Sequence, residues 1–153
     1  MNLIKLLDNR DKTLFVGIGN VLKKDDGVGV FISQNLEKNA LVDALTVEVS
    51  IENYIGKINS LAPEKLILID CVDFGKDAGY YKLTDLNTMR DFTTNTHNIS
   101  LGRLKDLFVV DDIKVLGIQP GDVSFGEGLT QDVEKTAFEV LRIITQQLQH
   151  KNN

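Results

Sequence analysis

Residues 65–70 read Lys-Leu-Ile-Leu-Ile-Asp, and this stretch decides the fold that we expect. Four consecutive apolar side chains are typical of a strand that is buried on both faces of a parallel sheet. We therefore predict a central strand over residues 65–69, with Asp70 directly after it. A carboxylate in that position is unfavourable unless it is paired, caps the following backbone or belongs to a site.

Four further stretches predict strands around this one. Residues 13–18 and 113–118 are short apolar runs, and residues 45–49 alternate between apolar and polar side chains. Residues 80–84 predict an extra strand, for which an antiparallel direction is open.

Apolar residues at helical spacing predict helices between the strands, over residues 27–38, 53–61, 98–108 and 131–149. Thr130 is a candidate N-cap for the last helix, and residues 73–79 predict a turn. This alternation indicates an α/β fold with three α/β/α layers: a twisted, mostly parallel sheet of about five strands with helices on both faces. We expect a single domain over residues 1–153, with a frayed tail at residues 150–153.

The composition limits the classes of function. The net charge of -5 and the scattered lysines argue against a nucleic-acid surface, which needs clustered Lys and Arg. The single cysteine, Cys71, excludes an intramolecular disulfide. We see no secretory signal pattern, and no apolar run approaches the roughly 20 residues that span a bilayer. We therefore expect a cytoplasmic protein without membrane insertion, and its oligomeric state stays open.

Three polar fragments carry the chemistry of the chain. They are Gly17-Ile18-Gly19-Asn20 running into Asp25-Asp26-Gly27, then Asp70, and then Thr96-His97-Asn98. In an open α/β sheet, ligands bind at the carboxyl ends of the strands, where we expect all three fragments to meet. Two carboxylates and one imidazole would form a partial coordination shell for a borderline divalent metal.

Each fragment also has a purely structural interpretation. Gly17 and Gly19 suit tight turns, and a dinucleotide-binding turn is disfavoured because Leu22 occupies the third glycine position. The Asp25-Asp26 pair is typical of a helix N-cap, and one aspartate could cap while the other faces the crevice. His97 could be a helix-start residue bonded to the backbone.

Two nearby groups have weaker claims to the chemistry. Asp73 competes with Asp70 but lies further into a turn, where solvent is expected to reach it. Cys71 has acidic neighbours, which disfavour a thiolate nucleophile, so we expect a small buried residue.

Read jointly, these motifs resemble the [NiFe] hydrogenase maturation endopeptidases. The matching segments are Val16–Leu22 with Asp25–Gly27, then Leu68–Asp73, and Thr96–Asn98 with Leu101. Leu116–Pro120 is similar to a segment of the branch that serves the energy-converting and formate-linked group 4 hydrogenases. The resemblance spans roughly residues 13–145, nearly the whole chain.

The resemblance implies an aspartyl-type endopeptidase that removes the C-terminal extension of a hydrogenase large-subunit precursor after nickel insertion. Nickel would be supplied by the precursor, and no organic cofactor is implied. The family's metal-contacting positions correspond to Asp26, Asp70 and His97. The first is a glutamate in some relatives, so aspartate keeps the charge with a shorter reach. Supporting residues are expected at Gly19, Asn20, Asp25 and Gln119.

Two alternatives remain open at this stage. A peptidyl-tRNA hydrolase-like enzyme also opens with a strand and Gly-x-Gly-Asn, although here Val-Leu follows Asn20 in place of Pro-Gly. A metallochaperone or assembly scaffold would bind the precursor without cutting it. Within the protease interpretation, the ion either activates water or only positions the peptide, and without activation Asp26 or Asp70 would be the general base.

Overall fold

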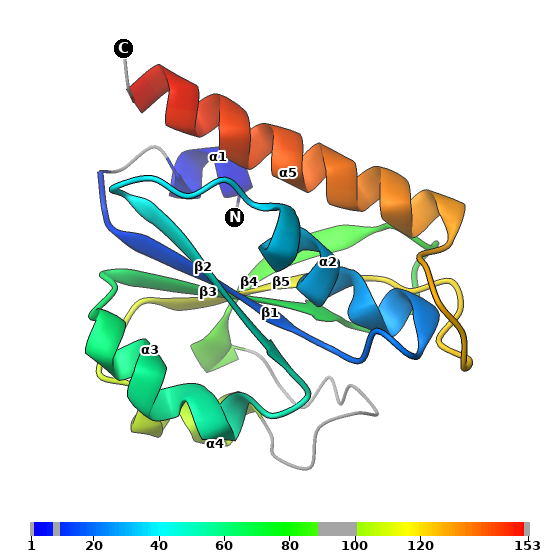
Figure 1. The fold of residues 1–153 in the computed structure, drawn as a ribbon, viewed down its shortest axis with the longest axis horizontal. Coiled ribbons are helices and arrows are strands. Elements are labelled where there is room, and N and C mark those ends of the chain that lie inside the picture. Colours follow the sequence, from blue (N-terminus) through cyan, green and yellow to red (C-terminus); the bar gives the residue numbers. More distant parts are fainter. Residues whose placement is uncertain (1, 8–9, 89–100, 152–153) are drawn as a thin grey trace.

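One five-stranded sheet organises the chain (Figure 1). The computed structural model describes residues 2–7, 10–88 and 101–151. The strands are β1 (Thr13–Ile18), β2 (Val42–Glu48), β3 (Lys65–Cys71), β4 (Tyr81–Asp85) and β5 (Ile113–Ile118). Their order is β2-β1-β3-β5-β4, with β4 antiparallel to β5 and the other neighbours parallel. The predicted α/β class and the extra strand are confirmed, and the open question of its direction is answered as antiparallel.

Helices cover both faces of the sheet, as the alternating pattern predicted. The helices are α1 (Leu3–Leu6), α2 (Val28–Asn35), α3 (Ile55–Leu61), α4 (Leu101–Leu104) and α5 (Gln131–Lys151). Short 3-10 helices are η1 (Lys24–Gly27), η2 (Ile51–Tyr54), η3 (Leu86–Thr88) and η4 (Lys105–Leu107). Helices α1, α2 and α5 lie on one side, and α3 and α4 lie on the other (Figure 1). Within the described ranges, no helix has the length and apolarity needed to cross a membrane.

The central strand supplies side chains to two separate cores. Ile67 and Ile69 belong to the core under α2 and α5, whereas Leu66 and Leu68 belong to the core under α3 and α4. Successive side chains of a strand point to opposite faces, so a continuous apolar run is what a sheet covered on both sides requires.

Close approach of α2 to the sheet explains two glycines. A Cβ at Gly17 would lie 2.4 Å from the carbonyl oxygen of Gly29, and one at Gly29 would lie 2.1 Å from that of Ile69. No side chain fits at either position. Helix α2 is thereby held against β1 and β3, and η1, directly before it, lies against β3.

Several predicted boundaries were wrong. Strand β3 continues through Cys71, so Asp70 lies inside the strand, opposite Gly117 of β5, and not after its end. The helix predicted over residues 27–38 stops at Asn35, because Leu36 adopts an extended conformation. Strand β2 begins at Val42, three residues earlier than predicted, since pairing with β1 extends it beyond its alternating part.

The chain ends and the fourth helix also differ from expectation. Helix α1 was not predicted, and α5 extends to Lys151, into the expected tail. Of the helix predicted over residues 98–108, residues 98–100 lie outside the described part of the chain. The rest is one α-helical turn followed by η4, and Leu107 at the end of η4 is 55% exposed.

Candidate functional site

Two of the three predicted metal contacts lie at the carboxyl-terminal edge of the sheet. Asp26 is carried by η1 and is 4% exposed, and Asp70 is carried by β3 and is fully buried. The Asn20 amide donates to Asp26 Oδ2 at 3.2 Å, and the Cys71 amide donates to Asp70 Oδ1 at 2.8 Å. The second contact matches the alternative in which Asp70 bonds to the following backbone.

The pKa of the Cys71 thiol depends on the negative charge at this edge of the sheet. Burial raises its pKa most, and the carboxylates of Asp70, Asp26, Asp25 and Asp73 raise it further. These four carboxylates therefore make the environment of the thiol at the end of β3 negatively charged. The thiol stays protonated at neutral pH and is buried, as predicted, so it is unsuited to serve as a nucleophile.

The third predicted contact, His97, lies outside the described residues. Within the described ranges, no group of three or more His, Cys, Asp or Glu side chains is arranged to hold a metal ion. The structure thus places Asp26 and Asp70 at one edge and leaves the complete set of Asp26, Asp70 and His97 untested.

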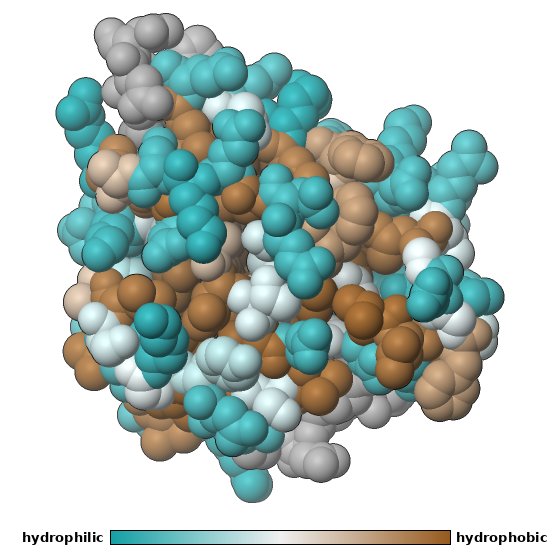
Figure 2. Space-filling model, viewed as in Figure 1, coloured by the Kyte–Doolittle hydropathy of each residue, from teal (hydrophilic) through white to brown (hydrophobic). Residues whose placement is uncertain are grey.

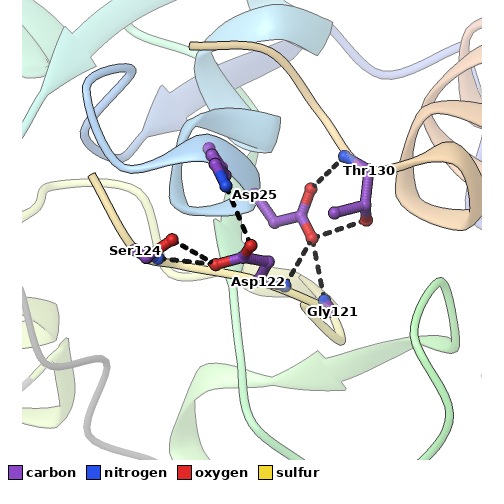
Figure 3. A network of polar contacts seen from close by, with 6 residues as sticks. Asp25, Gly121, Asp122, Ser124 and Thr130 are labelled. Atoms are coloured by element: carbon purple, nitrogen blue, oxygen red, sulfur yellow. Dashed lines mark hydrogen bonds and ion pairs between the residues drawn. The ribbon is translucent and has the colours of Figure 1, made fainter. Parts of the chain in front are cut away.

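Asp25 has a different role from Asp26, although the two are neighbours in η1. Its carboxylate is fully buried and accepts hydrogen bonds from the amides of Gly121, Asp122 and Thr130 and from the Thr130 hydroxyl. All four donors belong to residues 119–130, which join β5 to α5 and which we call the β5–α5 loop. Figure 3 shows the Asp25 carboxylate between Thr130 on one side and Gly121 and Asp122 on the other.

This arrangement corrects the interpretation of Asp25-Asp26 as an N-cap pair. The N-cap positions of η1 and α2 are Lys23 and Gly27, and neither has a side-chain capping bond. Asp25 instead binds the backbone just before α5, where Thr130 occupies the predicted N-cap position and its carbonyl accepts from the Glu134 amide at 2.9 Å. The contact joins residues about a hundred positions apart, so local sequence spacing gave no signal for it.

A second set of contacts fixes the same loop to the segment before Asp25. Lys24 Nζ lies 2.9 Å from Asp122 Oδ2, and the Lys24 amide donates to the Gly126 carbonyl at 3.1 Å. The Ser124 hydroxyl and amide, followed by Lys24, hold the pKa of Asp122 well below its usual range. Figure 3 shows Ser124 and Asp122 within this network.

Gly19 and Asn20 shape the turn that faces Asp26. Gly19 has φ +145°, and a Cβ there would lie 1.9 Å from the Asp26 carbonyl oxygen. The Asn20 side-chain oxygen accepts from the Leu22 amide at 3.0 Å. Both predicted supporting residues therefore lie beside Asp26.

Gln119 supports the loop that follows β3. Its Oε1 accepts from the Phe74 amide at 2.6 Å, and its Nε2 donates to Asp73 Oδ1 at 3.1 Å. The Gly75 amide and then Gln119 lower the pKa of Asp73, which is exposed as predicted. The geometry assigns Gln119 a supporting role, through hydrogen bonds that strand and helix periodicity could not reveal.

Apolar side chains are exposed around this edge. Val21, Leu22 and Phe125 are 44%, 59% and 83% exposed. A pocket of about 210 Å³ next to them is lined in part by Phe31 and Leu129. Apolar surface beside α2 is visible on the face shown in Figure 2. The sequence motifs include Val21 and Leu22, but they gave no indication that these side chains are exposed.

Comparison with known proteins agrees with the fold and the motifs. A family profile described as hydrogenase maturation protease matches residues 31–147, a range that includes Asp70 and His97 and begins after Asp26. The chain is 30% identical over 129 residues to the hydrogenase 3 maturation protease of Escherichia coli strain K12, covering 81% of this chain and 82% of that protein.

Solved structures give the same result. The crystal structure of a [NiFe] hydrogenase maturation protease, HycI, from Thermococcus kodakarensis KOD1 has a TM-score of 0.82 at 26% identity, covering 96% of this chain and 98% of that one. The solution structure of the endopeptidase HycI from Escherichia coli has a TM-score of 0.72 at 26% identity, covering 86% and 87%. Fold, motif order and family match agree, and the chain belongs to the hydrogenase maturation proteases, a family of endopeptidases.

Proposed function

We propose that this endopeptidase removes a C-terminal extension from the large-subunit precursor of a [NiFe] hydrogenase, in the cytoplasm, after nickel has been inserted. Nickel bound in the precursor is the feature that the enzyme recognises. The observation that carries the proposal is the pair of buried carboxylates, Asp26 and Asp70, on neighbouring elements at one edge of the sheet. Family membership makes the precursor the substrate to test.

The charge at this edge supports recognition of a cation. The carboxylates that raise the pKa of Cys71 create a negative potential at the end of β3. Carboxylate and imidazole are ligands for borderline divalent metals, so Asp26, Asp70 and His97 would complement ligands that the precursor already supplies. Sharing the ion in this way makes cleavage depend on correct loading of the precursor.

Peptide hydrolysis also needs a group that accepts a proton from water. Water adds to the scissile carbonyl, its proton passes to a base, and the leaving amine takes up a proton when the C–N bond breaks. Asp26 and Asp70 are buried carboxylates at this edge of the sheet, and either is suited to be that base. Nickel of the precursor would polarise the carbonyl or hold the peptide in place.

The proposed substrate branch is the group 4 hydrogenases. The resemblance of Leu116–Pro120 to that branch supports this choice. Gln119 within this segment binds the loop after β3, so the segment is part of the framework around Asp70.

Single substitutions of the carboxylates test the proposal. Asp26→Asn and Asp70→Asn keep the size of each side chain and remove its charge, and we expect each to lower the cleavage rate of nickel-loaded precursor by about a hundredfold or more. Asp85→Asn is the matched control. Asp85 ends β4 and pairs with Lys114 near the amino-terminal end of β5, whereas Asp26 and Asp70 lie at the carboxyl ends of the parallel strands.

Cleavage would be followed by mass spectrometry of the precursor C-terminus. A wild-type rate in either variant, with the protein folded, would remove that residue from the mechanism. A precursor that stays full length with wild-type protein, although it binds, would favour the non-cleaving scaffold. Membership of the protease family leaves no observation in favour of the peptidyl-tRNA hydrolase alternative.

A further inference from the structure

We propose that Asp25 is a positioning residue for the reaction: its buried carboxylate holds the β5–α5 loop against η1 and thereby keeps the adjacent Asp26 in place. The inference rests on the proposed function, because Asp26 must act on the precursor for its position to matter. Asp25 itself is not placed in contact with the substrate or the ion.

The hydrogen bonds of Asp25 anchor the β5–α5 loop to η1. Gly121 and Asp122 amides donate to Oδ2 at 2.8 and 3.0 Å, and the Thr130 hydroxyl donates to the same oxygen at 2.7 Å. The Thr130 amide donates to Oδ1 at 2.7 Å. Both carboxylate oxygens are thus engaged with donors, which is the arrangement that a fully buried carboxylate requires.

Three backbone contacts extend the anchor along the segment before Asp26. The Asp25 amide donates to the Asp122 carbonyl at 3.1 Å, and the Gly126 amide donates to the Leu22 carbonyl at 2.9 Å. Lys24 donates to Gly126 and pairs with Asp122. Residues 22–25 and the β5–α5 loop are therefore joined by several hydrogen bonds and one ion pair.

Asp26 is confined between these joined segments and the turn after β1. Gly19 lies so close to the Asp26 carbonyl that no side chain fits between them. On the other side, the chain is fixed one residue earlier, at Asp25. A loss of the Asp25 contacts would release this restraint, and misplacement of a reacting group by about 1 Å can lower a rate by about a hundredfold.

The β5–α5 loop also carries Phe125, which is 83% exposed. The experiment must therefore distinguish a loop that docks the precursor from a loop that keeps Asp26 in place. If the loop served mainly to dock the precursor, its release would weaken binding and raise KM. If it keeps Asp26 in place, its release lowers kcat and leaves KM nearly unchanged.

Steady-state cleavage of nickel-loaded group 4 precursor by four variants tests the inference. Asp25→Asn replaces an acceptor oxygen by an NH2 group that faces amide donors. Thr130→Val removes one hydroxyl donor at nearly constant volume, and Thr130→Ser retains it. Asp85→Asn is the control for loss of a carboxylate that accepts a backbone bond away from the site.

We expect Asp25→Asn to lower kcat by about tenfold or more, with KM within about twofold of wild type. Thr130→Val should lower kcat by a smaller factor, and Thr130→Ser should recover most of that loss. Asp85→Asn should keep the wild-type kcat. Rates are normalised to the folded fraction from circular dichroism, and the Thr130 pair decides the question if Asp25→Asn does not fold.

Three results would overturn the inference while the proposed function stands: a wild-type kcat in folded Asp25→Asn, a raised KM with unchanged kcat, or a Thr130→Ser variant as slow as Thr130→Val. Failure of the wild-type protein to cleave a cognate, nickel-loaded precursor is a distinct outcome, which contradicts the proposed function and the inference with it.

Discussion

Gly19 lies directly against the backbone of Asp26. Its φ of +145° is one that L side chains rarely adopt, and the Asp26 carbonyl occupies the space that a Cβ would need. The sequence alone suggested only that glycine permits a tight turn here. The structure adds the reason: the turn after β1 passes directly against η1, which itself lies against β3.

Gly19→Ala should therefore destabilise the fold by at least about 2 kcal/mol, from backbone strain and the steric conflict with Asp26. Urea unfolding followed by circular dichroism would measure the change. Gly56→Ala in α3 is the matched control, since a Cβ at that position would meet nothing within 4 Å and the variant should gain about 0.5 kcal/mol. Equal stability of the two variants would contradict this account of Gly19.

An ion pair between the antiparallel strands β4 and β5 contributes to the stability of the fold away from the candidate site. Lys114 at the start of β5 lies 2.9 Å from Asp85 of β4 and 2.6 Å from Asp112. The Lys114 ammonium and then the Asn87 amide hold the pKa of Asp85 below its ordinary value of 3.8. The cross-strand charge pair helps to attach the edge strand at the end of the sheet away from Asp70.

This shift predicts a pH-dependent contribution to stability. Because the pKa of Asp85 is lower in the folded state, its stabilising effect is complete above the unfolded value of 3.8 and is lost as the pH falls through the folded value. The stability difference between wild type and Asp85→Asn should therefore shrink as the pH is lowered from 7 toward 3. Urea unfolding at several pH values checks this, and a difference that stays constant would contradict it.

The hydrophobic pattern of the sequence predicted the positions of some strands and helices better than their ends. The apolar runs at residues 13–18 and 113–118 coincide with β1 and β5, because strands buried on both faces leave an uninterrupted apolar signal. Strand ends were less predictable: β3 continues past Asp70 because pairing with β5 determines its length, and an apolar count stops at the first charge. Helix ends were also less predictable: the helix predicted over residues 27–38 stops at Asn35, because tertiary contacts help to decide where a helix ends.

At the scale of the whole molecule, the topology explains why the candidate site could be approached from sequence. In a mostly parallel sheet the carboxyl ends of neighbouring strands share one edge, so residues after β1 and at the end of β3 had to converge. The β5–α5 loop was not predicted as a partner of Asp25. Its contacts join distant segments through backbone amides, which every residue type except proline carries.

We propose that this protease cleaves its precursor only after nickel has been inserted. The most direct measurement is incubation of the protein with a group 4 hydrogenase large-subunit precursor, with and without nickel, followed by intact-mass analysis of the C-terminus. We predict loss of a short C-terminal peptide from the nickel-loaded precursor and none from the nickel-free one. Equal cleavage of both forms would contradict the role of nickel, and no cleavage of either cognate form would contradict the proposed endopeptidase function.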